Sequence, residues 1–148
     1  MTAFAPRPAR PWHLWPVGLA ATLWHAAGAL DYALMQFRVQ AYRDQVPEEW
    51  VLYFDAVPAW VTGAWAVGVW IGLLGALLLL ARERAAPLML AAAFFGLAAA
   101  TVWLIWVSDP PMADVTGTEG VWVMLGATAA SAVLWLYARW MRARGVLG

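Results

Sequence analysis

Four long apolar stretches, at residues 14–37, 57–80, 87–107 and 120–137, dominate this sequence. A bilayer core about 30 Å thick takes about 20 mostly apolar residues to cross as a helix, so each stretch is long enough to be a span. Hydrophobic residues make up 64% of the chain and charged residues 12%, against roughly 45–50% and 25% in soluble domains. This composition argues against a water-soluble protein. The sequence predicts one integral membrane domain, an all-α bundle of four transmembrane helices.

The first stretch differs from the other three because it contains His25 and Asp31. A second interpretation is therefore open for it. Two arginines precede its apolar run, and residues 27–29 resemble the small-residue cleavage site of a secretory signal. The apolar run continues past that site to Met35, which favours a membrane span.

Charge placement predicts the orientation of the four spans, although the formal net charge is zero. Basic residues in short loops favour the cytoplasmic side of a membrane. The arginine-rich side holds Arg7, Arg10, Arg82, Arg84, Arg139, Arg142 and Arg144, with Glu83. The opposite side holds Arg38 and Arg43 with Asp44, Glu48, Glu49, Asp55, Asp109, Asp114 and Glu119. We therefore expect both termini in the cytoplasm and the chain in a bacterial inner membrane.

The two connections on the predicted outer side differ in character. In the longer one, residues 38–56, Pro47 and the two acids after it are typical of the first turn of a short helix. Aromatic residues follow at helical spacing, so we expect a short interfacial helix on the membrane surface, or a lid over the bundle. The second connection, residues 108–119, is acidic and contains Pro110 and Pro111. It is predicted to be a plain exposed connector.

Small and polar residues share about half the circumference of the first span, on two adjoining stripes at helical spacing. In lipid, such a face must turn toward other helices or toward water, because unsatisfied polar groups are costly in hydrocarbon. Several tryptophans of the other spans lie near the same outer depth. We therefore predict an outward-facing polar and aromatic binding pocket, lined by Asp31, Tyr32, Gln36, Trp60, Trp65 and Trp103.

Ionisable groups inside a membrane suggest a second hypothesis, a proton or ion pathway. His25 and Asp31 differ in depth by about 9 Å at 1.5 Å per residue, and would be successive stations of a small transporter or channel. Structural interpretations are also open for both residues. Asp31 would pair with Arg38 or accept indole N–H bonds, and His25 would bond to a backbone carbonyl, Thr128 or Ser131.

The second stretch carries a stripe of small residues at helical spacing, which predicts close approach of another helix. The sequence leaves open whether that helix belongs to the same chain or to a second copy. The stripe comprises Ala64, Gly68, Gly72, Gly75 and Ala76.

Several kinds of chemistry have no support in the sequence. The chain has no Cys and only two His, and without an HExxH motif or a ligand cluster we expect neither a metal nor a cofactor. No phosphate-binding loop or nucleophile elbow occurs, so a non-enzymatic protein is predicted. The balanced charge argues against nucleic acid. The expected partners are the lipid bilayer and either a second copy or a larger membrane complex, with the chain as a binding or accessory subunit.

Two segments, residues 24–36 and 41–90, contain an Asp-Tyr pair in the first span and a Pro-Ala-Trp at the start of the second. They resemble a family of small bacterial membrane proteins with four spans, some of which carry the label of sugar transporter. His25 stands where members usually have Asn. The resemblance implies the four-span topology but no established activity. The matching residues are Asp31, Tyr32, Gln36, Pro58, Ala59 and Trp60.

Overall fold

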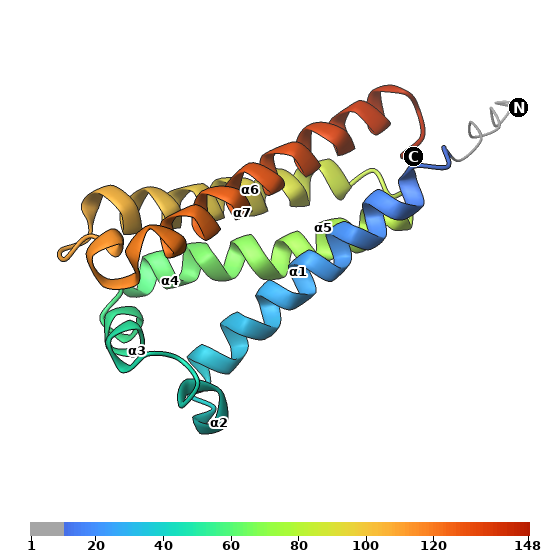
Figure 1. Cartoon of the computed structure of the whole chain (residues 1–148). Helices are drawn as coiled ribbons and strands as arrows, with labels where there is room; N and C mark the ends of the chain where they lie inside the picture. Colours follow the sequence, from blue (N-terminus) through green and yellow to red (C-terminus); the bar gives the residue numbers. More distant parts are fainter. Residues whose placement is uncertain (1–10) are drawn as a thin grey trace, which may run out of the picture.

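The computed structural model describes residues 11–148, and all regular secondary structure in that range is helical (Figure 1). Two of the elements, η1 and η2, are π-helical turns. They continue α4 and α6, so α4–η1–α5 and α6–η2 are two long helices. The elements are α1 (Leu14–Gln36), α2 (Gln40–Arg43), α3 (Glu48–Asp55), α4 (Ala59–Ala66), η1 (Val67–Ile71), α5 (Gly72–Leu80), α6 (Ala86–Val102), η2 (Trp103–Val107) and α7 (Met112–Ala143).

Three of these helices in the described range are long and apolar enough to cross a membrane: Ala59–Leu80, Ala86–Val107 and Met112–Ala143. The prediction of an all-α chain with membrane-capable helices is thus confirmed. α1 has 23 residues, which is sufficient length, but it is not among the three. The fourth span, and the side on which the termini lie, stay predictions; Arg7 and Arg10 of the orientation argument lie outside the described residues.

Residues 108–119 differ from the predicted exposed connector. α7 begins at Met112, eight residues before the predicted span at 120. Gly117 interrupts it with φ 67° and ψ −174°, a conformation that glycine adopts without steric cost. The resulting kink turns the first helical turn inward, so that Met112 and Thr116 are buried. The connector prediction is wrong because an acidic, proline-containing segment can still bury an apolar face.

The long connection between α1 and α4 is mostly helical. Pro47 directly precedes α3, whose first turn contains Glu48 and Glu49, in line with the short helix that the sequence predicts there. α3 packs against α7, and the ring of Phe54 lies 5.6 Å from that of Trp65. α2 was not predicted. Together α2 and α3 form a layer across one end of the long helices (Figure 1).

The helix of residues 59–80 lies at the centre of the bundle. α1 packs against its α5 and η1 parts, α6 packs along all three parts, and α7 packs on α6. A Cβ atom at Gly72 would overlap the ring of His25 in α1, whereas one at Gly75 would lie 2.9 Å from Leu90 of α6. The small residues of this helix therefore contact two helices of the same chain.

The remaining members of the predicted small-residue stripe also lie at helix contacts. A Cβ atom at Gly68 would lie 3.0 Å from Leu97, and one at Gly96 would lie 2.7 Å from the carbonyl oxygen of Ala64. Ala76 is fully buried. Close backbone approach thus joins the central helix to α6 along most of its length.

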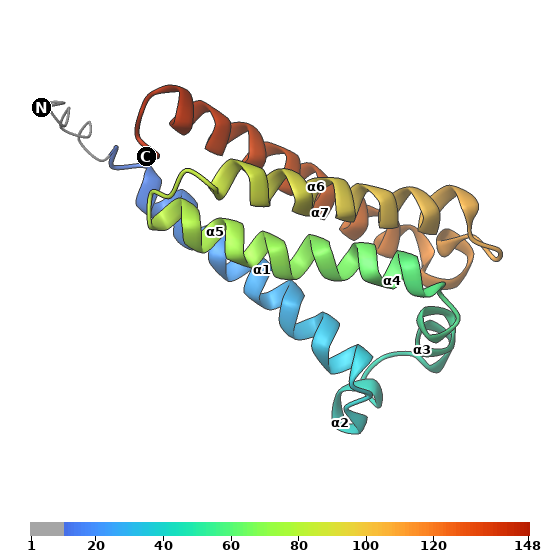
Figure 2. The ribbon, with the colours of Figure 1, turned by 180° about the vertical axis from the view of Figure 1, so that it is seen from behind.

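One end of the bundle, here called the closed end, contains the beginning of α1, the turn between α5 and α6, and residues 144–148 (Figure 2). The backbone N–H of Gly148 donates to the carbonyl of Arg82 at 3.1 Å, and His13 Nδ1 lies 2.6 Å from the hydroxyl of Tyr137. The core here joins all four long helices. It comprises Leu14, Leu79, Ala86, Leu90, Ala138, Met141, Val146 and Leu147.

The opposite end, here called the open end, contains α2, α3 and residues 108–111. Toward this end α1 diverges from α4, as both views show (Figures 1 and 2). The second core cluster lies here without any residue of α1. Its buried members are Leu97, Leu104, Met112 and Met124. The open end is therefore a three-helix core with α1 beside it.

Candidate functional site

Two adjoining cavities occupy the space between α1 and the other helices. The outer chamber, of about 360 Å³, lies beneath the α2–α3 layer. The inner chamber, of about 290 Å³, lies deeper, between α1, η1 and α7. Because four residues line both, the two chambers form one continuous site. The shared residues are Asp31, Trp65, Val123 and Met124.

The inner chamber contains two polar side chains that are deeply buried. His25 is 3% exposed and Ser131 is 1% exposed, and both line this chamber. Nε2 of His25 and Oγ of Ser131 have no hydrogen-bond partner within residues 11–148. Buried polar groups are nearly always paired, and leaving one unpaired costs about 1–3 kcal/mol. In the inner chamber, these two atoms are therefore buried polar groups whose hydrogen-bonding capacity is unmet.

The surrounding helices explain why His25 lacks its predicted partners. Its ring lies against Gly72, where only a residue without a side chain leaves room for it. The hydroxyl of Thr128 lies 2.8 Å from that of Thr101 and donates to the carbonyl of Met124 at 2.9 Å. Thr128 therefore joins α7 to α6 and is not bonded to His25.

η1 forms one wall of the inner chamber. Its Gly68 and Val69 are lining residues. A π-helical turn adds a residue to the local repeat, and such turns are frequent at functional sites. A Cβ atom at Gly28 of α1 would lie 3.3 Å from Val69, so this wall approaches α1 closely.

The outer chamber is polar and aromatic at its rim. Asp31 Oδ1 accepts a hydrogen bond from the Tyr42 hydroxyl. Burial of Tyr42, followed by the hydrogen bond and charge of Asp31, raises the pKa of that hydroxyl to about 12. It therefore stays protonated at neutral pH and donates to the carboxylate. Glu119 supplies a second carboxylate, and Trp50 and Trp65 supply aromatic rings to the lining.

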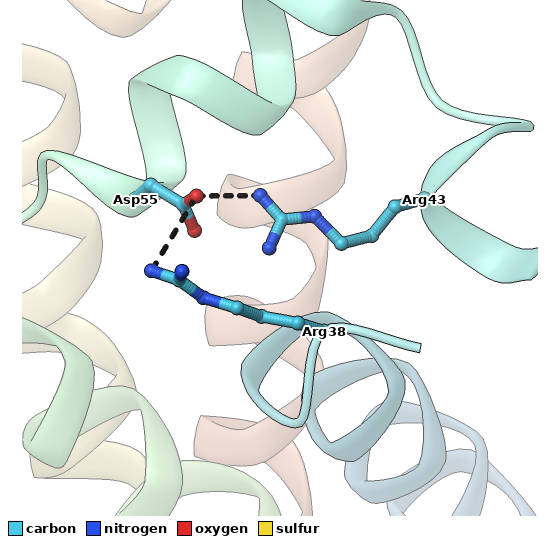
Figure 3. A network of polar contacts seen from close by, with 3 residues as sticks. All are labelled: Arg38, Arg43 and Asp55. Atoms are coloured by element: carbon cyan, nitrogen blue, oxygen red, sulfur yellow. Dashed lines mark hydrogen bonds and ion pairs between the residues drawn. The ribbon is translucent and has the colours of Figure 1, made fainter. Parts of the chain in front are cut away.

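Arginines at the open end are paired away from these chambers. Nη2 of Arg43 lies 2.5 Å from Oδ2 of Asp55, and Nη2 of Arg38 lies 3.8 Å from the same oxygen (Figure 3). The structure thus places Arg38 against Asp55, not against Asp31 as one interpretation of the sequence had it. This ion-pair group connects the end of α1 with α2 and α3.

The structure separates the six residues that the sequence predicted to line one pocket. Asp31 and Trp65 line both chambers. The edge of the Tyr32 ring lies against Trp65, with ring centroids 5.6 Å apart. The others face neighbouring surfaces: Tyr32 and Gln36 line a pocket with Asp55, Trp103 lines a pocket beside Tyr53, and the exposed Trp60 packs against Trp103.

Several lining residues were missed or assigned differently from the sequence. His25 belonged to the alternative ion pathway, and the structure places it with Asp31 in the inner chamber. From the sequence, Ser131 is a bonding partner of His25 or a small residue at a helix contact, not a lining residue. Tyr42 and Glu119 were missed because they lie in segments predicted to be an interfacial loop and a connector. Among the described residues, no three His, Asp or Glu side chains cluster as they would to hold a metal ion.

Comparisons of the chain with protein-family models, with curated proteins and with solved structures gave no match. The resemblance to the four-span bacterial family therefore stays a prediction from the sequence motifs. The chemistry of the site has to be argued from its own residues.

Proposed function

We propose that this chain is a non-enzymatic integral protein of the bacterial inner membrane that binds a small amphipathic molecule in the two chambers. It would act as a binding or accessory subunit, with four spans, both termini in the cytoplasm and the chambers opening outward. Support for the membrane comes from the three apolar helices. A helix of the length of α1 extends about 34 Å at 1.5 Å per residue, which is sufficient for the fourth span.

One observation carries the binding proposal: a continuous site leads from the polar rim at Asp31 to the unpaired atoms of His25 and Ser131. Ligand sites are typically concave and mostly apolar, with a few polar groups that fix the orientation of the ligand. An amphipathic molecule matches this arrangement, since its apolar body suits the chamber walls and its polar groups suit the two ends.

A cavity-filling pair of variants tests this proposal. Ala127 of α7 lines the inner chamber, whereas Ala129 is exposed and lines neither chamber. In nanodiscs of phosphatidylcholine, we expect saturable binding of at least one of three probes: decanol, decyltrimethylammonium or decyl sulfate. Ala127→Phe should abolish that binding and Ala129→Phe should retain it. The absence of saturable binding for all three probes would contradict the proposal.

The fourth span can be tested because the chain has no Cys. Trp12 lies exposed at the closed end and Ala41 lies exposed at the open end. In spheroplasts, a membrane-impermeant maleimide should label Ala41→Cys. It should label Trp12→Cys only after the membrane is permeabilised. Equal labelling of both in intact spheroplasts would show that α1 does not cross.

The alternative function is a small transporter or channel, favoured by the presence of His25 and Asp31 in one chamber. The buried core at the closed end supports binding over conduction, because its leucines fill the space between the helices below His25. Solute or proton flux into liposomes, compared for the wild type and Asp31→Asn, separates the two. Flux that depends on Asp31 would favour the transporter.

A further inference from the structure

The formal charges lining the two chambers are all negative. Asp31 lines both chambers and Glu119 lines the outer one, and none of the described arginines lines either. Arg38 and Arg43, the two described arginines at the open end, are both paired with Asp55. Both arginines thus contact one carboxylate that lines neither chamber.

Asp31 has a hydrogen-bond partner but no ion-pair partner among the described residues. That partner is the hydroxyl of Tyr42, which orients the carboxylate but carries no positive charge. Carboxylates gain most from a hydrogen-bonded cation. Glu119 of α7 lines the same outer chamber, so two acids from different helices line it.

Aromatic rings line the same two chambers. Trp50, Phe54 and Trp65 line the outer chamber, and Trp24 lines the inner one. The face of an aromatic ring attracts a cation, and quaternary ammonium groups are recognised in this way by clustered rings. Acids and rings together therefore select for an organic cation over a neutral or anionic head group.

The deeper part of the site adds an independent reason to expect a ligand. His25 and Ser131 are both more than nine-tenths buried, line the inner chamber and have unpaired polar atoms. Apart from Asp31, where the two chambers meet, most of the remaining lining there is apolar, including Val69 and Leu97. This part suits the apolar body of a molecule whose far end can bond to these two side chains.

Building on the proposed function, we propose that the ligand is a cationic amphiphile. Its protonated amine or quaternary ammonium group binds between Asp31 and Glu119 against the rings of Trp50 and Trp65. Its apolar body extends into the inner chamber toward His25.

The test compares three probes that share a decyl chain and differ in head-group charge. In nanodiscs of phosphatidylcholine, decyltrimethylammonium should bind the wild-type protein about tenfold more tightly than decanol, a difference of about 1.4 kcal/mol. Decyl sulfate should bind most weakly. The double variant Asp31→Asn, Glu119→Gln should reduce the cation preference, measured as the ratio of the dissociation constants of decanol and decyltrimethylammonium, to within about twofold. Asn at position 31 keeps an oxygen that accepts the Tyr42 hydroxyl bond.

Asp114→Asn is the matched control, because Asp114 is exposed on α7 near the same end but lines neither chamber. It should keep the full cation preference. The wild type could bind decanol and decyltrimethylammonium equally, and Ala127→Phe could abolish both. That result would overturn the proposal of a cationic ligand but leave the proposed binding function intact. An unchanged preference in the double variant would also overturn the proposal of a cationic ligand. Failure of all three probes to bind would overturn the proposed function itself.

Discussion

The closed and open ends of this bundle differ in how α1 meets the other helices. At the closed end, Leu14 of α1 is fully buried among Leu79, Leu90 and Met141, which come from the other three long helices. At the open end, the buried core contains no residue of α1. A single helix thus belongs to a tight four-helix core at one end and borders a cavity at the other.

This difference shows how a small bundle can hold an internal site without losing its structure. Close-packed interiors have few voids larger than a water molecule, so the two chambers need a separate source of support. The closed end provides it, with residues 146 and 147 folded back into the core. Polar contacts of α2 and α3 hold the diverging end of α1. Variants at the two ends should therefore have unequal effects.

The largest effect is expected from Gly75→Leu. A Cβ atom at Gly75 would already lie 2.9 Å from Leu90 and 3.1 Å from its backbone nitrogen, so a leucine must separate α5 from α6. Overpacking of this kind costs about 3 kcal/mol. Thermal unfolding in detergent should show a large loss of stability. Gly126→Leu is the control, since a Cβ atom there has no neighbour within 4 Å, and an equal loss in both would refute the tight closed end.

A smaller effect is expected from Leu147→Ala. Leu147 is 4% exposed and belongs to the core of the closed end. Removing a buried leucine side chain costs about 2 kcal/mol or more, because a cavity remains. The same change at Leu136, which is 56% exposed, should have little effect on the unfolding midpoint. If Leu136→Ala proves the more damaging of the two, residues 146 and 147 do not anchor the closed end.

Thr101→Val tests the α6–α7 contact that continues to the open end. The hydroxyls of Thr101 and Thr128 lie 2.8 Å apart, and such hydrogen bonds between helices in membranes average about 0.6 kcal/mol. We expect a loss of that size in the free energy of unfolding. The effect of Ala127→Phe on probe binding should be the same with and without Thr101→Val. A loss above about 2 kcal/mol would show that this contact supports more than a pair of hydroxyls.

An effect on global stability of similar size, but confined to the open end, is expected from Asp55→Asn. The two ion pairs of Asp55 are partly exposed, and such pairs contribute about 1 kcal/mol or less. The loss of the Asp55–Arg43 ion pair should loosen the α2–α3 layer locally, because this pair connects α3 to α2. Amide hydrogen exchange should increase in residues 38–56 and stay unchanged in α5 and α6. Uniform acceleration along the chain would contradict the separation of the two ends.

Much of the fold was predictable because membrane helices leave a strong local signal. The predicted stretch at 57–80 corresponds to α4–η1–α5 at Ala59–Leu80, and that at 87–107 to α6–η2 at Ala86–Val107. Apolar length alone sets these limits. The start of α7 was not predictable in this way, since the burial of Met112 and Thr116 depends on a kink at Gly117.

The candidate site was predictable only in part. The sequence marked Asp31 and His25 as unusual, because ionisable residues within an apolar stretch are rare. Trp60 and Trp103 were grouped with Asp31 because all three lie at a similar predicted depth in the membrane. Depth does not determine which face of its helix a side chain occupies. Tyr42 and Glu119 reach the site from segments far apart in the sequence, and no local pattern brings them together.

The sequence by itself determined that this chain forms long apolar helices and that its few ionisable residues within them are exceptional. These properties depend on the composition and residue spacing of each segment, which can be read without knowing its neighbours in space. Only the tertiary structure decided that α1 diverges from α4, that His25 packs on Gly72 and that the two chambers join at Asp31. Those features depend on which helix faces meet, and the meeting of two faces is set jointly by residues distant along the chain.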